Sequence, residues 1–289
     1  MRQSTLAARF DAQRPRLQAV AYRILGSLSD SDDAVQEVWL RLQRADAAAI
    51  DNLDAWLTTV TARVSLNLLR DRRAHREGPL EGLHPEPVVS PASGTDPERE
   101  VLLADAVGIA LQVVLDTLDP AQRLAFVLHD MFAVPFSEIA AILERTSDAT
   151  RQLASRARRS VRDAVPEPEP DPVRRRAVVD AYFAATRDGD LDGLAAVLAP
   201  DVVLRAHRRD GSPWVLNGAG RVARGALMAQ ELAPFARPAL VNGAAGAVAF
   251  DGDTPFAILA FVIAGGQIHS IDIFNDRELV PGLIGPGAW

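Results

Sequence analysis

The stretch Pro135–Ala164, PFSEIAAILERTSDATRQLASRARRSVRDA, predicts two short helices joined by a tight turn. The first helix is expected over Pro135–Leu143 and the second over about Ser147–Ala164, with only "ERTS" joining them. Two helices linked by so short a turn make a helix-turn-helix candidate, a motif whose second helix enters the major groove of DNA.

The second of these helices is strongly basic. Between Asp148 and Asp163 there are five arginines and two aspartates, a local charge of +3 in a chain whose formal net charge is −7. One helix face is expected to pack on Ile139, Ala140 and Leu143 through small and apolar residues: Ala149, Leu153, Ala157, Ser160 and Ala164. The remaining polar residues form a candidate DNA-contact set: Ser147, Thr150, Arg151, Gln152, Ser155, Arg156, Arg158, Arg159 and Arg162.

An α-helix fits the major groove of B-DNA, and side chains near its start reach base edges while later arginines hold phosphates. We therefore expect Arg151 and Gln152 to read bases and Arg159 to contact a phosphate. The alternative is that the charged residues form an ordinary solvated face. The short turn before the helix favours DNA contact over a solvated face, because it makes the two helices a helix-turn-helix candidate.

Length and composition limit the remaining possibilities. The chain has 289 residues, enough for two or three domains, and contains no cysteine, which excludes disulfides, thiolate metal sites and cysteine nucleophiles. No apolar run approaches the roughly 18 residues of a membrane-spanning helix, and the N-terminus "MRQSTLAARFDAQRPR" lacks a signal pattern. We expect a cytoplasmic protein with no membrane contact, no metal and no cofactor.

Two proline-rich stretches divide the chain. Residues 77–96, within "EGPLEGLHPEPVVSPASGTDPE", and residues 166–172, "PEPEPDP", are expected to be linkers. They separate three blocks, residues 1–76, 97–165 and 173–289.

The first block is predicted to be helical. Asp30 or Ser31 is expected to cap a helix whose apolar positions recur at three- and four-residue spacing: Ala34, Val35, Val38, Trp39 and Leu42. A second helix, about Leu53–Arg73, ends in a basic cluster, because Arg63–Arg76 holds five arginines and one aspartate, a charge of +4. This cluster is either an ordinary helix end, where arginines are favoured, or a grip for unstacked single-stranded bases.

The other two blocks differ in class. In the second, Asp96-Pro97 and Asp119-Pro120 each resemble a helix cap followed by proline at the first helical position. The third block predicts two helices, with apolar residues at Val173–Ala185 and Leu191–Leu198, followed by five strand-like runs: Val202–His207, Ala239–Val241, Ala247–Phe250, Phe256–Ile263 and Ile268–Phe274. The expected fold is two all-α domains followed by an α+β domain with a curled antiparallel sheet.

A family resemblance rests on two stretches that occur in order. "DSDDAVQEVWLRLQRA" with "NLDAWLTTVTARVSLNLLRDRR" resembles region two of the bacterial extracytoplasmic-function (ECF) sigma factors. "LDPAQRLAFVLHDMFAVPFSEIAAILERTSDATRQLASRARR" resembles their region four, the helix-turn-helix domain. The resemblance covers residues 10–165 and implies a sigma region 2 domain (1–76), a linker (77–96) and a sigma region 4 domain (97–165).

The resemblance also implies roles for individual residues. The first of the two predicted helices in region two would dock on the β′ subunit of core RNA polymerase. The docking residues would be Asp33, Gln36, Glu37, Trp39, Leu40 and Arg41. Trp39 is alternatively a core residue. The second would open the downstream promoter element and hold flipped bases through Trp56, Thr59, Arg63, Asn67, Arg70, Arg72 and Arg73. The basic helix after the tight turn would read the upstream element.

The third block, residues 173–289, contains the stretches "AYFAATRDGDLDGLAAVLAPDVVLRAHRRDG", "ALVNGAAGAVAF" and "FVIAGGQIHSIDIFNDRELVPGL". These stretches resemble the SnoaL-like cone domains appended to one group of these sigma factors. The likeness departs at "RDGSPW" and "FNDRELVP", where members often carry a glycine-rich stretch and an Asn-Pro-Asp-type segment. Free-standing relatives use an acid/base pair inside the cone. His207, His269 and Asp272 are the candidate pocket groups here, but we expect no catalysis, and we expect single replacements of them to leave transcription largely intact.

Three functions compete. The leading one is a sigma factor that binds the β′ and β subunits of core RNA polymerase and promoter DNA, with a C-terminal domain that modulates it. A ligand-sensing DNA-binding regulator is the alternative, although such a protein has no use for the "DDAVQE…W" helix. An isomerase or cyclase fused to a DNA-binding half is the third. A small-molecule or protein regulator of the C-terminal domain is left open, and cutting the chain after Val165 is expected to change promoter activity in either direction.

Overall fold

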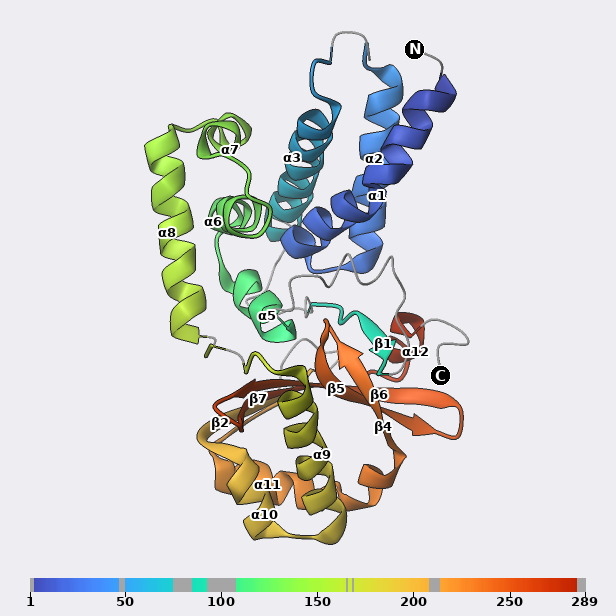
Figure 1. Ribbon diagram of the computed structural model, residues 1–289, viewed down its shortest axis with the longest axis vertical. Coiled ribbons are helices and arrows are strands. Elements are labelled where there is room, and N and C mark those ends of the chain that lie inside the picture. The colour runs from blue at the N-terminus through green and yellow to red at the C-terminus, as the bar shows by residue number, and fades with distance from the viewer. Residues whose placement is uncertain are drawn as a thin grey trace. The chain divides into compact units, whose positions relative to one another are not determined.

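A computed structural model of the protein describes residues 3–46, 50–74, 85–92, 108–164, 166–167, 169–207 and 214–284 (Figure 1). The chain forms two compact units. The N-terminal unit consists of Met1–Pro79, Glu100–Asp105 and Val114–Asp163, and the C-terminal unit consists of Leu80–Arg99, Ala106–Val113 and Ala164–Trp289. The predicted regions two and four therefore share one unit.

The region-two part of the N-terminal unit is built from α1 (Gln3–Leu25), α2 (Leu28–Arg44) and α3 (Leu53–Ala74). Their apolar faces meet in one core that includes Phe10, Leu17, Val35, Val38, Leu42 and Leu57. The predicted cap of α2 is corrected, because Ser27, rather than Asp30 or Ser31, caps the helix by accepting a hydrogen bond from the Asp30 backbone N–H.

The region-four part contains the C-terminal half of α5 (Ile109–Thr117), then α6 (Pro120–Phe126), the π-helical turn η2 (Val127–Met131), α7 (Phe136–Leu143) and α8 (Ser147–Ala164). The Asp119 cap is confirmed, since its carboxylate accepts from the Ala121 N–H at 3.0 Å. The predicted start at Asp96-Pro97 lies outside the described residues. The two helices and the tight turn of the helix-turn-helix are confirmed, with Glu144 turning the chain at φ +54°.

The buried face of α8 is rotated from the predicted one. Thr150, Ala154 and Ala157 are buried, whereas Ser160 and Ala164, which were expected on the packing face, are exposed. The Thr150 hydroxyl donates to the Thr146 carbonyl at 3.0 Å, so this side chain turns back toward the start of its own helix. The prediction left out Ala154, and it left out Thr150 because it did not consider that a threonine can satisfy its hydroxyl locally and be buried.

The C-terminal unit contains a seven-stranded sheet in the order β1-β4-β5-β6-β7-β2-β3. Its strands are β1 (Val89–Pro91), β2 (Leu198–His207), β3 (Trp214–Asn217), β4 (Ala236–Val241), β5 (Ala244–Asp251), β6 (Thr254–Ala264) and β7 (Gln267–Phe274). The five predicted strands are confirmed, while β2 pairs with β7 in parallel rather than antiparallel fashion. At the β4–β5 hairpin, Asn242 and Gly243 both have positive φ, as the predicted Asn-Gly turn requires.

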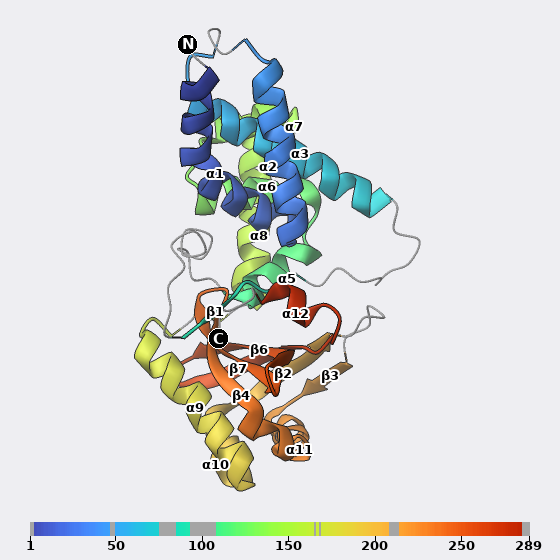
Figure 2. The same cartoon turned by 90° about the vertical axis from the view of Figure 1, so that its right-hand side faces the viewer.

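Helices cover the two faces of this sheet unequally. The helices α9 (Pro172–Asp188), α10 (Leu191–Val197) and α11 (Ala219–Met228) lie on one face, and the short α12 (Val280–Leu283) lies on the other (Figures 1 and 2). A 3-10 segment, η3 (Gln230–Phe235), precedes β4. The first core contains Tyr182, Leu194, Phe261 and Ile271, and the second contains Val248, Ile258, Phe274 and Val280.

Strand β1 corrects the prediction that residues 77–96 are only a linker. Val89 pairs with Val241 and Pro91 with Ala239, so this strand is an edge of the C-terminal sheet. The Asn242 side-chain oxygen accepts from the Val88 N–H at 2.8 Å, and the Asn242 N–H donates to the Val88 carbonyl at 2.8 Å. Residues 88–91, between regions two and four, thus belong to the C-terminal sheet.

Candidate nucleic-acid interface

Helix α8 presents most of the predicted upstream-element residues to solvent. Eight of the nine lie at its surface; seven are exposed and Ser147 is half-buried: Ser147, Arg151, Gln152, Ser155, Arg156, Arg158, Arg159 and Arg162. Thr150 is the ninth, and its buried side chain is not available to DNA. The helix therefore carries a basic surface along its length, with Arg151 and Gln152 in its first turns.

Two arginines on this surface are oriented by carboxylates. Asp148 contacts Arg151 at 2.5 Å, and the Arg151 guanidinium lies 5.7 Å from the centre of the Phe136 ring, within cation–π range. Asp130 in η2 contacts the Nε of Arg158 at 2.5 Å. These contacts limit the rotamers that the two arginine side chains adopt. The sequence prediction missed Asp130 and Phe136, because neither lies on the helix that they support.

Helix α3 carries the predicted downstream-element residues on two sides. Arg63, Asn67 and Arg70 are exposed and line a cavity of about 210 Å³ together with Arg41 and Leu66, and with Ile142, Leu143 and Glu144 of the helix-turn-helix. Trp56 and Thr59 are half-buried near the start of α3. The side chain of Arg73 lies outside the described residues. The arrangement brings two cationic side chains of α3, Arg63 and Arg70, together with Arg41 of α2 around one cavity.

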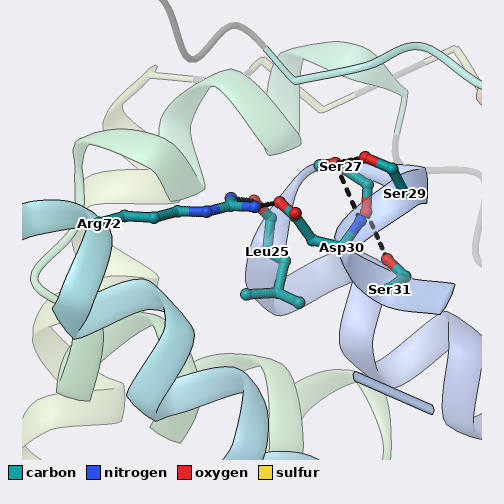
Figure 3. Close-up of polar contacts among 6 residues, drawn as sticks. All are labelled: Leu25, Ser27, Ser29, Asp30, Ser31 and Arg72. Atoms are coloured by element: carbon teal, nitrogen blue, oxygen red, sulfur yellow. Dashed lines mark hydrogen bonds and ion pairs between the residues drawn. The ribbon is translucent and has the colours of Figure 1, made fainter. Parts of the chain in front are cut away.

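Arg72 has a different environment (Figure 3). Its guanidinium forms an ion pair with Asp30 and donates to the Leu25 carbonyl at 3.4 Å, so it joins the end of α3 to the α1–α2 junction. Ser27, which caps α2, lies in the same cluster. Cations are favoured at the C-terminal carbonyls of a helix such as α1. The structure therefore gives Arg72 a role in holding region two together.

We expect Arg72→Met to lower the unfolding free energy of the N-terminal unit by about 1–3 kcal/mol, because a partly buried carboxylate and a helix-end carbonyl lose their shared donor. Urea unfolding followed by tryptophan fluorescence measures this change. The matched variant Arg70→Met, at an exposed position of the same helix, should change stability by less than about 0.5 kcal/mol. Unchanged stability of Arg72→Met together with weakened DNA binding would return Arg72 to the DNA-contact set.

The face of α2 predicted to contact the polymerase is accessible to solvent. Asp33, Gln36, Leu40 and Arg41 are exposed, and Glu37 is half-buried and bonded to the Arg41 Nε at 2.8 Å. Leu40 is a large apolar residue with 37% of its surface exposed. Trp39 is half-buried with its ring 4.9 Å from that of Phe10, so it packs against the core of region two, as its alternative interpretation required.

In the C-terminal unit the structure brings together two of the three candidate pocket groups. The Nε2 of His207 lies 2.9 Å from the Oδ1 of Asp272, both side chains are buried, and the His207 ring stacks on Phe274 at 4.5 Å. Register places this pair on the sheet face that carries Ile258 and Phe274, opposite the face covered by α9–α11. His269 lies at a bulge between Ile268 and Ser270, where the pairing register shifts, and takes no part in the pair.

The face under α9–α11 is filled by aromatic packing. Tyr182 lies 5.5 Å from both Phe183 and Phe261, and the two phenylalanines lie 6.0 Å apart. Burial raises the pKa of the Tyr182 hydroxyl well above its usual value. Desolvation by burial lowers the pKa of Arg176, and Asp180 offsets only part of this effect. Arg176 donates to the carbonyls of Gly246 and Ala239 and so joins α9 to the sheet. These contacts pack α9 onto the sheet.

No helix among the described residues is long and apolar enough to cross a membrane.

Comparison with known proteins follows the same division of the chain. Residues 10–75 match the model of Sigma-70 region 2, and residues 109–161 match that of Sigma-70, region 4. The ECF RNA polymerase sigma factor SigJ of Mycobacterium tuberculosis is 41% identical over 284 residues, which cover 92% of this chain and 90% of SigJ. SigG of the same organism is 25% identical over 316 residues, covering 97% of this chain and 84% of SigG. The crystal structure of SigJ aligns with a TM-score of 0.77 at 35% identity, over 94% of this chain and 97% of that one.

Proposed function

The chain belongs to the ECF RNA polymerase sigma factors, and from this premise we propose how its parts divide the work. As a sigma factor it binds core RNA polymerase and directs it to specific promoters. We propose that the C-terminal unit, with its seven-stranded sheet, is the SnoaL-like domain that the sequence resembles. The finer assignments below concern individual residues and the role of that domain.

Three helices carry the proposed contacts. The exposed face of α2 around Leu40 docks on the clamp helices of the β′ subunit, and α3 holds the opened downstream element through Arg63, Asn67 and Arg70. Helix α8 reads the upstream element in the major groove, with Arg151 and Gln152 at base edges. Melting needs no catalytic group, because binding of the opened strand shifts the equilibrium between paired and unpaired DNA. The protein acts in the cytoplasm, where the polymerase is.

We further propose that the C-terminal domain modulates the sigma factor without turning over a substrate. The observation that carries this proposal is strand β1, by which the segment between regions two and four pairs with β4. Ile109, at the start of α5, also belongs to the C-terminal core with Val89 and Ala239. Strand β1 and Ile109 therefore both attach the segment that connects the two DNA-binding regions to the C-terminal unit. Release of β1 from β4 would lengthen the part of the chain that can span the two regions, and docking of β1 would shorten it.

The absence of turnover is supported by the candidate acid/base pair. His207 and Asp272 are buried and bonded to each other on the face away from α9–α11, which leaves neither of them directed into the helix-covered interior. A ligand of this domain would therefore change promoter activity only by binding one arrangement of the chain, with β1 docked or with β1 released, more tightly than the other.

We expect Val89→Asp to raise promoter-directed transcription by the reconstituted holoenzyme several-fold, because a charge on a buried edge strand releases β1 from β4 and frees the connecting segment. Multiple-round transcription with purified core polymerase measures the effect at saturating sigma factor.

Val173→Asp is the matched control, since Val173 is 74% exposed in the same unit and gains the same charge without leaving a buried site. Circular dichroism confirms that both variants keep their folds. Equal activity of Val89→Asp, Val173→Asp and the unaltered protein would show that β1 docking has no regulatory consequence.

A further inference from the structure

A cavity of about 380 Å³ lies in the C-terminal unit, between the first turns of α9 and the edge of the sheet formed by β4 and β1. Its lining is mainly apolar and comes from all three elements, including Pro172 of α9, Pro238 and Leu240 of β4, and Ala92, which follows β1. Its volume is within the roughly 300–1,000 Å³ of pockets that hold small organic ligands. None of the described aromatic residues that pack under α9–α11 lines it, so it is a different site from that filled interior.

Two arginines of α9 line this cavity, and the sheet already holds one of them. The Nη1 of Arg176 donates to the Gly246 carbonyl at 2.9 Å, and its Nη2 donates to the Ala239 carbonyl at 2.5 Å. Asp180 lies 3.9 Å from the same Nη1. Arg176 is therefore a fixed part of the cavity wall.

Arg175 is the cation that is available to a ligand. Its Nη1 donates to the Glu169 carbonyl at 2.9 Å, whereas its Nε is buried with no hydrogen-bond partner among the described residues. Asp171 forms an ion pair with the neighbouring Arg174 at 3.6 Å, and no carboxylate in the described part of the chain pairs with Arg175. A carboxylate binds the edge of a guanidinium through two parallel hydrogen bonds. Because Nε has no acceptor now, turning its edge toward an anion in the cavity sacrifices no hydrogen bond of that atom.

We propose that this cavity binds a small apolar carboxylate, with its carboxylate on Arg175 and its apolar part against Pro238 and Leu240, and that the bound ligand holds β1 in the sheet. An inorganic anion would leave the apolar lining uncovered, and a neutral hydrocarbon would leave the guanidinium edge unpaired. A ligand that carries both parts matches both features of the cavity.

The position of the cavity connects its occupancy to β1. Ser90 of β1 pairs with Leu240, which lines the cavity, and Ala92 contributes to the wall two residues later. Release of β1 would carry Ala92 away and remove one side of the cavity. The ligand therefore binds the arrangement with β1 docked more tightly and shifts the chain toward it. Only the consequence for transcription rests on the proposed function of β1.

Octanoate is the probe for this site, because it joins a short acyl chain to a carboxylate. The compounds 1-octanol and inorganic phosphate each carry one half of that chemistry. Isothermal titration calorimetry with the full chain should give octanoate a Kd at least about 10-fold lower than that of either compound, since each lacks one set of contacts.

Two variants and one control locate the bound octanoate. Arg175→Met should weaken octanoate binding at least about 10-fold, because hydrogen bonds to a charged group are lost. Ala92→Phe should also weaken it, by filling the cavity from an exposed position without altering Arg175. Arg174→Met removes the same charge from an exposed neighbour and should change the Kd less than about 2-fold at physiological salt.

Hydrogen exchange measures whether the ligand holds β1 in place. The Val88 N–H donates to the Asn242 side chain at 2.8 Å, so its exchange requires that this segment leaves the sheet. Octanoate at about ten times its Kd should slow exchange of residues 88–90 about 10-fold, because it stabilises the docked form alone. The same concentration should have little effect on Arg175→Met.

Three results would overturn the proposal. Equal affinity for octanoate and 1-octanol, or unchanged octanoate affinity in folded Arg175→Met and Ala92→Phe, would contradict the site. Octanoate binding that leaves exchange of residues 88–90 unchanged would contradict its connection to β1. Transcription by the holoenzyme tests the proposed function separately, and octanoate should lower it several-fold through Arg175. If octanoate binds and slows exchange while transcription stays constant, the regulatory role of β1 fails and the site stands.

Discussion

Leu40→Asp is expected to abolish promoter-directed transcription by lowering the affinity of the chain for core polymerase at least about 100-fold, since a charge at the centre of a protein interface stays desolvated and unpaired. Leu40 is an exposed apolar residue on the α2 face, beside the Glu37–Arg41 ion pair. Its replacement removes no core contact of region two, so the loss should be one of binding. Fluorescence anisotropy of labelled sigma factor titrated with core polymerase measures it.

Leu279→Asp is the control for this variant, because Leu279 is a leucine with 44% exposure in the C-terminal unit. It should bind core polymerase as the unaltered protein does. If Leu40→Asp binds normally and still supports transcription, the docking face lies elsewhere on region two.

The second large effect is expected at the start of α8. Arg151→Ala and Gln152→Ala should each reduce discrimination between correct and incorrect base pairs in the upstream element by about 10-fold to 100-fold, because each good base contact contributes roughly 1–3 kcal/mol of specificity. Arg151 is held by Asp148 and lies against Phe136, so its removal also loses a preoriented donor. Competition with single-base-pair variants of the promoter, scored as transcription by the holoenzyme, gives the discrimination directly.

Arg159→Ala provides the contrast. As a phosphate contact it should weaken binding nearly equally at all sequences and lower the slope of log affinity against log salt by about 1. Base-specific losses at Arg159, with none at Arg151 or Gln152, would mean that another face of α8 meets the groove.

The features that the sequence predicted well are those encoded locally. The bounds of α8, Ser147–Ala164, follow from the short turn before it and from the helical spacing of its residues. The five predicted strands follow from apolar runs separated by turn residues. The Asn242-Gly243 turn was predictable because few other residue pairs adopt two successive positive φ angles readily.

The features that it missed depend on contacts between distant residues. Arg72 has the composition of a DNA contact, and only the nearby Asp30 and Leu25 show that it holds region two together. Strand β1 is only three residues long and lies within a proline-rich segment. So short a run has no alternating pattern from which a strand could be predicted. Its assignment comes from pairing with β4, some 150 residues later in the chain. The bulge at His269 likewise interrupts the alternation of side chains between the two sheet faces. The face to which the His269 side chain belongs could therefore not be predicted from the sequence.

Transcription in vitro tests most directly whether this protein acts as a sigma factor. Purified core RNA polymerase is combined with this protein on a library of genomic templates, and transcript 5′ ends are mapped with and without the sigma factor. We predict discrete start sites that appear only when both components are present, together with weak binding of promoter DNA by the protein alone. Tight promoter binding by the isolated protein, with no start site that depends on it on any template, would contradict a role in promoter-directed initiation.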